Sequence, residues 1–418
     1  MRTTVITNVR PWGTTAADLV IRGHQFAEIL PAHTAQLAAA DEVIAGEGLV
    51  ALPGLVNTHA HVDKSWCGKP WQSYAGQATT AGRIAHERKM RAGLGIPSVE
   101  VTRATLTEML RSGTTAIRSH VDVDLGVGLS GLDIVREAIT DLAPQLRYQL
   151  VAFPQDGVLR RPGVDKLLRR AAAAGVDAIG GLDPAGIDRD PVGQLNLLFD
   201  IAGDYGCQID IHLHDPGALG AFEMELIIER IRATNLIGKV NLAHGFAIAD
   251  LPASRQEELA AEFAELGVSF TTVAPLGRPV LPQDVLRRAG VRVGLGTDGF
   301  RDLWAPYGTG DLLHVAVNHA RMCGQRFDEQ LVWALRQATA GGLEFVGVTD
   351  QSLTDDVTAD ANTLTQHYRQ RDFAPGIQAD LLLVEAQNAM DALVSLPTRH
   401  LVMLAGTVIA RDGELVGC

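Results

Sequence analysis

The sequence predicts an α/β protein: a (β/α)8 barrel with a small β-sandwich domain formed from both chain ends. The main observation is that eight short apolar, β-prone runs alternate with longer helical patterns between residues 54 and 345. This alternation is typical of parallel βαβ units, and eight such units close a barrel. A second observation is β-type sequence at both ends of the chain. The length of 418 residues suits one large domain and a smaller one.

The predicted elements follow in order along the chain. Residues 1–53 contain strand candidates around Val5, Leu19 and Ile29 and form the first part of the small β domain. The barrel is predicted for residues 54–345. Its strand candidates are residues 52–61, 114–120, 147–153, 178–182, 208–212, 240–244, 268–272 and 291–298. The predicted helices are residues 99–110, 133–142, 164–174, 194–205, 221–234, 255–266, 282–289, 312–321 and 327–340.

The last part of the chain, residues 346–418, is predicted to complete the small β domain. Residues 349–372 are polar and are expected to form a loop and a connecting helix. β-type sequence then recurs at residues 379–384, 401–404 and 407–410. These strands are expected to pair with the N-terminal ones.

Composition and charge exclude several classes of function. The formal net charge of −13 argues against binding to nucleic-acid phosphates or to a membrane surface. The four cysteines are scattered without a CxxC pair, so neither a disulfide framework nor a zinc–cysteine cluster is indicated. No secretory signal is seen, nor a run of about 18 apolar residues. We expect a cytoplasmic protein whose partner is a small molecule, and the sequence leaves homo-oligomerisation open.

Histidines gather at the predicted strand ends, where barrel enzymes have their active sites. His59 and His61 end the first barrel strand and point to the same side, because side chains two apart on a strand do so. Neutral imidazole is a common metal ligand. The polar residues that follow later strands are His120, Gln155, Asp156, His212, His214, Asp215, His244 and Asp298.

Four of these side chains predict a site for one divalent ion. Three imidazoles and one carboxylate would leave a position open for water, whose pKa a bound ion lowers towards neutrality. Residues 178–182 on the fourth strand include no lysine that could bridge a second ion. Zinc and ferrous iron both suit such a ligand set. The predicted ligands are His59, His61, His212 and Asp298.

The motifs that contain these residues resemble those of the amidohydrolase superfamily, and in particular its cytosine deaminase branch. The likeness covers nearly the whole chain in the same order. Its closing segment, GIQADLLLVEA (376–386), resembles the family's final β segment. The other matching pieces are LPGLVNTHAHVDK (52–64), SGTTAIRSHVDVD (112–124), LVAFPQDG (150–157), IDIHLHD (209–215), NLAHG (241–245) and GTDGFRDLWAPYGTGD (296–311).

The resemblance implies roles for individual residues. The four predicted ligands match the family's metal ligands. His244 matches a histidine that polarises the attacked centre or, with Asp298, steadies the metal-bound hydroxide. Gln155 matches a glutamine that reads a ring carbonyl and the adjacent N–H, and its amide offers both a donor and an acceptor. Trp304 matches an aromatic residue that lines the ring pocket, and we place His120 among the substrate contacts.

Three positions depart from the cytosine deaminase pattern. The glutamate that serves as general acid/base is replaced by Asp215, which we expect to be the main proton carrier, with His214 as the alternative. The second acid, directly after the metal aspartate, is replaced by Gly299. Lys64 stands beside the predicted pocket, and the motifs HxHxDK and HxHD look more like N-isopropylammelide hydrolases.

The resemblance therefore implies a metal-dependent hydrolytic deaminase. The expected substrate is a pyrimidine- or triazine-like ring with a C(=O)–NH edge, from which an amino or small alkylamino group is removed. Metal-bound hydroxide would attack the ring carbon, and Asp215 or His214 would deliver a proton to the leaving amine. Two alternatives stay open: ring-opening of a cyclic amide by the same superfamily, and a non-catalytic amidohydrolase-like binding protein.

Overall fold

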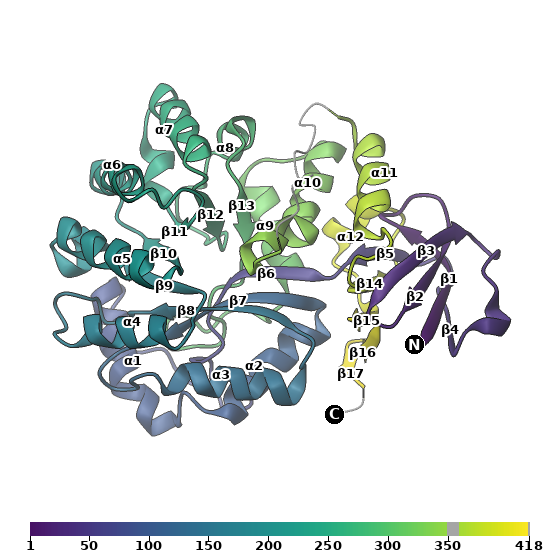
Figure 1. Ribbon diagram of the computed structural model, residues 1–418, viewed down its shortest axis with the longest axis horizontal. Coiled ribbons are helices and arrows are strands. Elements are labelled where there is room, and N and C mark those ends of the chain that lie inside the picture. The colour runs from purple at the N-terminus through teal and green to yellow at the C-terminus, as the bar shows by residue number, and fades with distance from the viewer. Residues whose placement is uncertain (349–358, 417–418) are drawn as a thin grey trace.

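The computed structural model describes residues 1–348 and 359–416, and its strands form two separate sheets. Figure 1 shows the barrel and its surrounding helices on the left and the second sheet, which both ends of the chain build, on the right. The prediction of a (β/α)8 barrel joined to a small β unit from both chain ends is confirmed. Most of the predicted connecting loop, residues 349–358, lies outside the described residues.

Eight parallel strands form the barrel in the order in which they occur along the chain. Three of them have the predicted bounds, whereas the last is shorter than the predicted 291–298. Their side chains are buried almost throughout, as expected for a parallel sheet that is covered by helices. The strands are β6 (Leu55–Ala60), β7 (Thr114–Asp122), β8 (Arg147–Phe153), β9 (Ala178–Leu182), β10 (Gln208–Leu213), β11 (Val240–His244), β12 (Ser269–Thr272) and β13 (Val293–Leu295).

Hydrogen bonds between β6 and the chain around β13 close the barrel. Thr58 Oγ1 donates to the carbonyl oxygen of Leu295 at 2.9 Å. The backbone N–H of Asp298 donates to the carbonyl oxygen of His59 at 3.0 Å. Closure of the barrel therefore fixes Asp298 beside His59, so two predicted metal ligands that are far apart in sequence become neighbours.

Helices connect the barrel strands, and several carry the capping residues that favour their ends. α5 (Pro191–Tyr205) follows Asp190, whose side chain accepts the N–H of Gly193, and it ends at Gly206 in the left-handed conformation. The remaining predicted helices are α2 (Val99–Arg111), α3 (Ser130–Leu142), α4 (Val164–Ala173), α6 (Gly217–Thr234), α7 (Ala253–Glu265), α8 (Gln283–Ala289), α9 (Leu312–Met322), α10 (Asp328–Ala338) and α11 (Ala361–Asp372).

Two helices are absent from the sequence prediction. α1 (Thr80–Leu94) is polar on most sides, so no apolar periodicity marks it; its only local signals are the cap at Thr79 and the left-handed Gly95. α12 (Ala389–Ser395) is only two turns long. Among the described residues, no helix has the length and apolar character needed to cross a bilayer.

The second sheet joins the two ends of the chain. β5 pairs antiparallel with β14, with Leu52 opposite Leu382, and parallel with the end of β1. Eight of the nine strands form one continuous hydrogen-bonded path, and β4 pairs with β1 as a branch. They are β1 (Thr3–Pro11), β2 (Ala17–Arg22), β3 (Gln25–Pro31), β4 (Glu42–Ala45), β5 (Val50–Pro53), β14 (Leu381–Val384), β15 (Arg399–Leu404), β16 (Thr407–Arg411) and β17 (Glu414–Leu415).

The strand predicted for residues 52–61 is two strands, and this corrects the prediction. β5 ends at Pro53 and belongs to the second sheet, whereas β6 begins at Leu55 and opens the barrel. Gly54 separates them, and a β-carbon at that position would overlap the side chain of Thr115. Only glycine therefore fits where the chain passes from one sheet to the other.

Candidate active site

Three histidines and one aspartate meet at the carboxyl-terminal end of the barrel. His59 lies on β6, His61 directly follows β6, His212 lies on β10, and Asp298 follows β13. The Nε2 atoms of His61 and His212 are 3.4 Å apart. Asp298 Oδ1 lies 3.4 Å from His61 Nε2 and 3.6 Å from His59 Nε2. The structure thus brings together the four side chains that the sequence predicts as metal ligands.

These separations suit a tetrahedral metal site. Nitrogen and oxygen ligands about 2.1 Å from a zinc-type ion lie roughly 3.4 Å from one another. The ligand atoms of His59, His61 and His212 all lie within 4.8 Å of one another. Within the described part of the chain, the buried His59 Nε2 has no hydrogen-bond partner. A cation between these side chains would provide one, so the residues present fit a divalent ion.

The site offers its ligands in the forms that bind metal. Burial lowers the pKa of His61 and of His212 well below the usual histidine value. Burial would raise the pKa of Asp298, but His59 and His61 outweigh that effect and hold the pKa well below the usual aspartate value. Neutral imidazoles and an ionised carboxylate are the states that coordinate a metal ion.

His120 supports the ligands from behind. Its ring lies 4.1 Å, centroid to centroid, from that of His59, and its Nε2 is 3.1 Å from Asp210 Oδ1. Arg118 Nε lies 2.9 Å from the other oxygen of Asp210. Burial lowers the pKa of His120 to about 4. The sequence places His120 among the substrate contacts, and this is corrected: the ring is completely buried and does not line the cavity.

Three strand ends at this site have a backbone conformation that side chains other than glycine rarely adopt. Asp183, His244 and Asp298 have φ values of 32°, 70° and 60°. Such a conformation costs about 1–3 kcal/mol at each residue and clusters at functional sites. His244 and Asp298 line the cavity described next, and Asp183 binds a further cavity residue, His214. The strained turns therefore coincide with the side chains that surround the predicted metal site.

A cavity of about 100 Å³ opens beside the predicted ligands. It lies within the loops that follow the barrel strands, as expected for this fold. His59 and Asp215 are not among the residues that line it. The predicted site residues that do line it are His61, His212, Asp298, His244, His214, Gln155, Lys64 and Trp304.

Lys64 and Gln155 form one wall of this cavity. Lys64 is 5% exposed, and its Nζ lies 2.5 Å from Gln155 Oε1 and 2.9 Å from Asp122 Oδ1. Glu87 Oε1 lies 3.9 Å from the same nitrogen. Burial would lower the pKa of Lys64, but Asp122 and Glu87 outweigh it and raise the pKa above the usual lysine value. Lys64 is therefore a buried ammonium group at the edge of the cavity.

This contact fixes how Gln155 faces a ligand. An ammonium group can only donate hydrogen bonds, so the atom of Gln155 next to Lys64 must be its amide oxygen. The amide nitrogen then remains for the cavity. The sequence predicts that Gln155 hydrogen-bonds both a ring carbonyl and the adjacent N–H. The oxygen of Gln155 already binds Lys64, so only the contact from its amide N–H groups to a ring carbonyl remains. Together the two side chains present hydrogen-bond donors.

His214, rather than Asp215, reaches the cavity. His214 Nδ1 lies 3.0 Å from Asp183 Oδ2, and its ring is stacked on that of His244 with centroids 4.4 Å apart. Its Nε2 is left as the nitrogen available to a ligand. Burial would lower the pKa of His214, but the carboxylate of Asp183 outweighs it and raises the pKa. The arrangement is that of an imidazole held by a carboxylate, as in many proton-transfer sites.

Asp215 is turned away, which corrects the expectation that it bends over the metal. It accepts the N–H of Gly186 at 2.8 Å and shares a hydrogen bond with Glu223, whose pKa burial raises to about 8. The physical reason is strand alternation. His214 is two residues beyond His212 and stays on the cavity side, and Asp215 falls on the other side.

Sequence reasoning missed four polar residues around this cavity, one of which is Arg83, a lining residue from α1. Asp183 orients His214, and Glu87 accepts a hydrogen bond from Trp304 Nε1. Asp302 lines the cavity together with Gly299. The sequence did contain signals for two of them as site residues. Asp183 directly follows a barrel strand, and Asp302 lies four residues after the predicted ligand Asp298. Glu87 had none, because it comes from the unpredicted helix α1.

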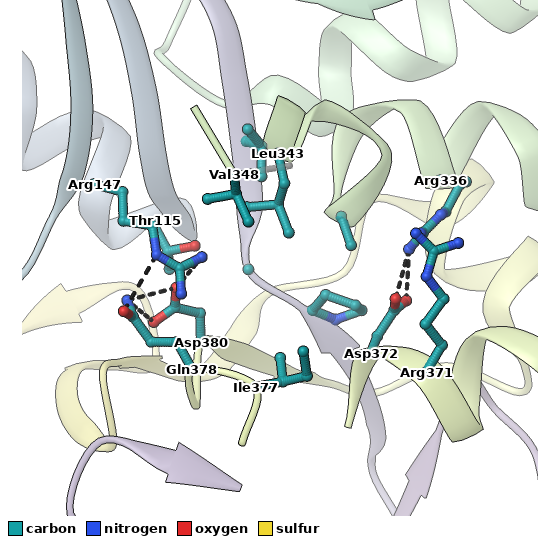
Figure 2. A pocket seen from close by; sticks show the side chains of 14 residues that line it. Thr115, Arg147, Arg336, Leu343, Val348, Arg371, Asp372, Ile377, Gln378 and Asp380 are labelled. Atoms are coloured by element: carbon teal, nitrogen blue, oxygen red, sulfur yellow. Dashed lines mark hydrogen bonds and ion pairs between the residues drawn. The ribbon is translucent and has the colours of Figure 1, made fainter. Parts of the chain in front are cut away.

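A larger cavity, of about 210 Å³, lies at the opposite end of the barrel, against the second sheet. Figure 2 shows its charged side chains in two groups, with Arg147, Gln378 and Asp380 on one side and Arg336, Arg371 and Asp372 on the other. Arg336 Nη1 lies 2.7 Å from both oxygens of Asp372. This cavity lies at the amino-terminal ends of the strands, which contribute to stability in barrel enzymes, whereas the active site lies at the carboxyl-terminal ends. We therefore assign the candidate active site to the histidine-lined cavity.

The fold and the site define the class of the protein: a barrel hydrolase with a histidine and aspartate metal centre. The chain belongs to the amidohydrolase family, whose model matches residues 144–364. It is therefore a hydrolytic enzyme of the kind that acts on C–N bonds, and the predicted superfamily is confirmed. The alternative of a non-catalytic binding protein is not supported.

The proteins that are similar to the chain include two curated proteins and a solved crystal structure. The uncharacterized protein YahJ of Escherichia coli K12 is 33% identical over 296 residues, which are 70% of this chain and 64% of YahJ. N-isopropylammelide isopropyl amidohydrolase of Pseudomonas sp. strain ADP is 26% identical over 90% of this chain and 89% of its own. The crystal structure of N-isopropylammelide isopropylaminohydrolase from Burkholderia multivorans covers both chains fully, with 39% identity and a TM-score of 0.88.

Proposed function

We propose that the protein is a metal-dependent aminohydrolase that releases a small alkylamine or ammonia from a triazine-like ring bearing a carbonyl group. The observation that carries this proposal is the donor wall of Lys64 and Gln155, which faces the cavity beside the predicted ligands. A ring carbonyl oxygen is the group that such a wall binds. The full-length similarity to an N-isopropylammelide isopropylaminohydrolase supports the choice of a triazine ring and an alkylamine.

The proposed reaction is a hydrolysis at a ring carbon. A divalent ion held by the four ligands would lower the pKa of a water molecule towards neutrality. The oxygen of water bonds to the ring carbon, and the bond from that carbon to the exocyclic nitrogen breaks. A ring carbonyl and a free amine are the products. We favour one ion, of zinc or ferrous iron, because the fourth strand offers no bridging lysine.

The chain's own residues bind the ring and move the proton in this proposal. Lys64 and Gln155 hold the ring carbonyl, and Trp304 provides an aromatic wall beside Lys64, whose Nζ is 5.8 Å from the tryptophan ring centroid. His214 takes the proton from the attacking water and gives it to the leaving amine. Asp183 holds the opposite nitrogen of His214 and stabilises its protonated form.

A substrate screen tests this function. Metal-reconstituted protein should be incubated with N-isopropylammelide, ammelide, cytosine and a hydantoin, and the amine and ring products separated by chromatography. We expect isopropylamine from N-isopropylammelide, with the ring intact. A ring-opened product would instead favour cyclic amide hydrolysis. No product from any ring would contradict the proposed function.

The metal content is a separate prediction. We expect about one tightly bound divalent ion per chain, because four ligands surround a single point and no lysine bridges to a second. Removal of the ion by a chelator should abolish turnover, and addition of zinc or ferrous iron should restore it. Elemental analysis of active protein that gave two ions per chain would contradict the mononuclear site.

A further inference from the structure

A carboxylate fills the space where residue 299 would carry its side chain. A β-carbon built on Gly299 would overlap Asp302 Oδ2, and both residues line the cavity. Gly299 is not in the left-handed conformation, so its backbone would accept a side chain. The obstacle is Asp302 itself. The sequence thus lacks an acid directly after Asp298, and the structure supplies one from three residues further along.

The two oxygens of Asp302 have different surroundings. Oδ1 accepts the backbone N–H groups of Trp304 and Ala305, each at 2.8 Å, and so caps the turn that follows. Oδ2 points towards Gly299, and no hydrogen bond to it is formed by any residue that the structure describes. Asp302 is only 7% exposed as a residue, but Oδ2 is not among the fully buried oxygens that lack a partner, so it keeps access to the cavity that Asp302 lines. A carboxylate oxygen that lines a cavity and has no protein partner can accept a hydrogen bond from a ligand.

The hydrogen-bond donors on the other wall of the cavity indicate which ligand group Oδ2 can bind. Lys64 and Gln155 offer donors to the cavity, and Asp302 offers an acceptor. A flat ring with a carbonyl oxygen and a ring N–H matches this pattern, since the N–H would meet Oδ2. Burial raises the pKa of Asp302 to about 6, and the backbone N–H of Ala305 and the charge of Lys64 oppose that shift, so the group is mainly a carboxylate at neutral pH.

We propose that Asp302 is a substrate-binding residue whose Oδ2 accepts a ring N–H, in the space that a side chain at position 299 would occupy. The inference rests on the proposed function and adds to it the ring edge that the enzyme selects. It predicts discrimination against rings that carry no hydrogen on that nitrogen. A purely structural role, as a cap for the turn at Trp304 and Ala305, makes no such prediction.

The variant Asp302→Asn separates the two roles. The asparagine oxygen can still accept the two backbone N–H groups, which leaves its NH2 group facing the cavity and a ring N–H. We expect an unchanged melting temperature and metal content, a kcat within a few-fold of wild type, and a KM raised roughly 10- to 100-fold. For a matched substrate that is methylated at the ring nitrogen, the KM of wild type and the KM of Asp302→Asn should be similar. Isothermal titration with the deaminated product should show the same loss of affinity.

Moving the carboxylate provides the second test. Asp302→Ser keeps a weaker cap and vacates the space beside Gly299, so KM should rise. Adding Gly299→Asp to that variant should lower KM again, because a carboxylate returns to the same place. Gly299→Asp alone should be impaired, since it would crowd Asp302. A double variant no better than Asp302→Ser would overturn the proposal.

The outcomes also distinguish this inference from the proposed function. Wild-type protein that releases no amine from any ring would overturn the function, and the role of Asp302 with it. Active wild-type protein alongside an Asp302→Asn variant of normal KM and normal product affinity would overturn the role of Asp302 alone.

Discussion

Alanine in place of His212 or Asp298 is expected to abolish turnover, because either change removes one of four ligands from the predicted metal site. A metal ion contributes several kcal/mol to such a transition state. At about 1.4 kcal/mol for each tenfold change in rate, turnover should fall by roughly 10³-fold or more. The bound metal should be lost in parallel. Elemental analysis and kcat on the substrate found by the screen measure the two effects.

The fold should survive both substitutions, since barrel stability resides mainly in the interior layers and the helix packing. Circular dichroism and the melting temperature of the metal-free proteins check this. Asp133→Ala is a matched control, because this aspartate side chain lies on α3 and is 84% exposed. Near-normal activity together with normal metal content in either ligand variant would remove that residue from the site.

His214→Asn is expected to retain metal and to lower kcat by about 10²–10⁴-fold, the usual contribution of general acid–base catalysis. His214 is the imidazole that lines the cavity, and Asp183 holds its Nδ1 at 3.0 Å. Asparagine preserves the polarity of the side chain but cannot carry a proton between water and amine. Asp183→Asn should lower kcat less, because the imidazole remains and loses only its orienting partner.

Asp215→Asn is the matched control for this experiment. Its carboxylate binds Gly186 and Glu223 outside the cavity, so kcat should change by less than about tenfold. The informative comparison is the ratio of kcat between the two asparagine variants at equal metal content. If Asp215→Asn were inactive while His214→Asn remained active, Asp215 would be the proton carrier and the loop around Gly186 would have to rearrange in the working enzyme.

Much of the fold follows from sequence periodicity alone. The strands at 147–153, 178–182 and 240–244 are short β-prone runs between clear helices, and their bounds were predicted to the residue. A domain boundary between residues 53 and 54 was also predicted, but the strand candidate at 52–61 was drawn across it, although Pro53 and Gly54 are turn residues. The sequence around Gly54 does not show which strand β5 pairs with. That information resides in β14, more than 300 residues away.

The same distinction between local pattern and tertiary packing explains which parts of the candidate site were predicted. His59, His61 and His212 are placed by strand geometry, which the sequence contains, and they meet as predicted. Contacts between loops are set by tertiary packing, and these were missed or misjudged. Asp302 reaches back to Gly299 only because the turn at Trp304 folds over it. Which of His214 and Asp215 faces the cavity depends on whether the alternation of side chains continues beyond the end of β10.

The pairing of β5 with β14 has a consequence for the order in which the enzyme is made. β5 is followed after one residue by β6, which carries His59, yet its partner strand extends to Val384. During synthesis from the amino terminus, one edge of β5 stays unpaired until nearly the whole chain has left the ribosome. Contacts so distant in sequence form slowly. β5, which leads into the first barrel strand, is therefore among the last strands to gain both neighbours, and nascent chains that stop before residue 381 should expose the β5 edge to aggregation.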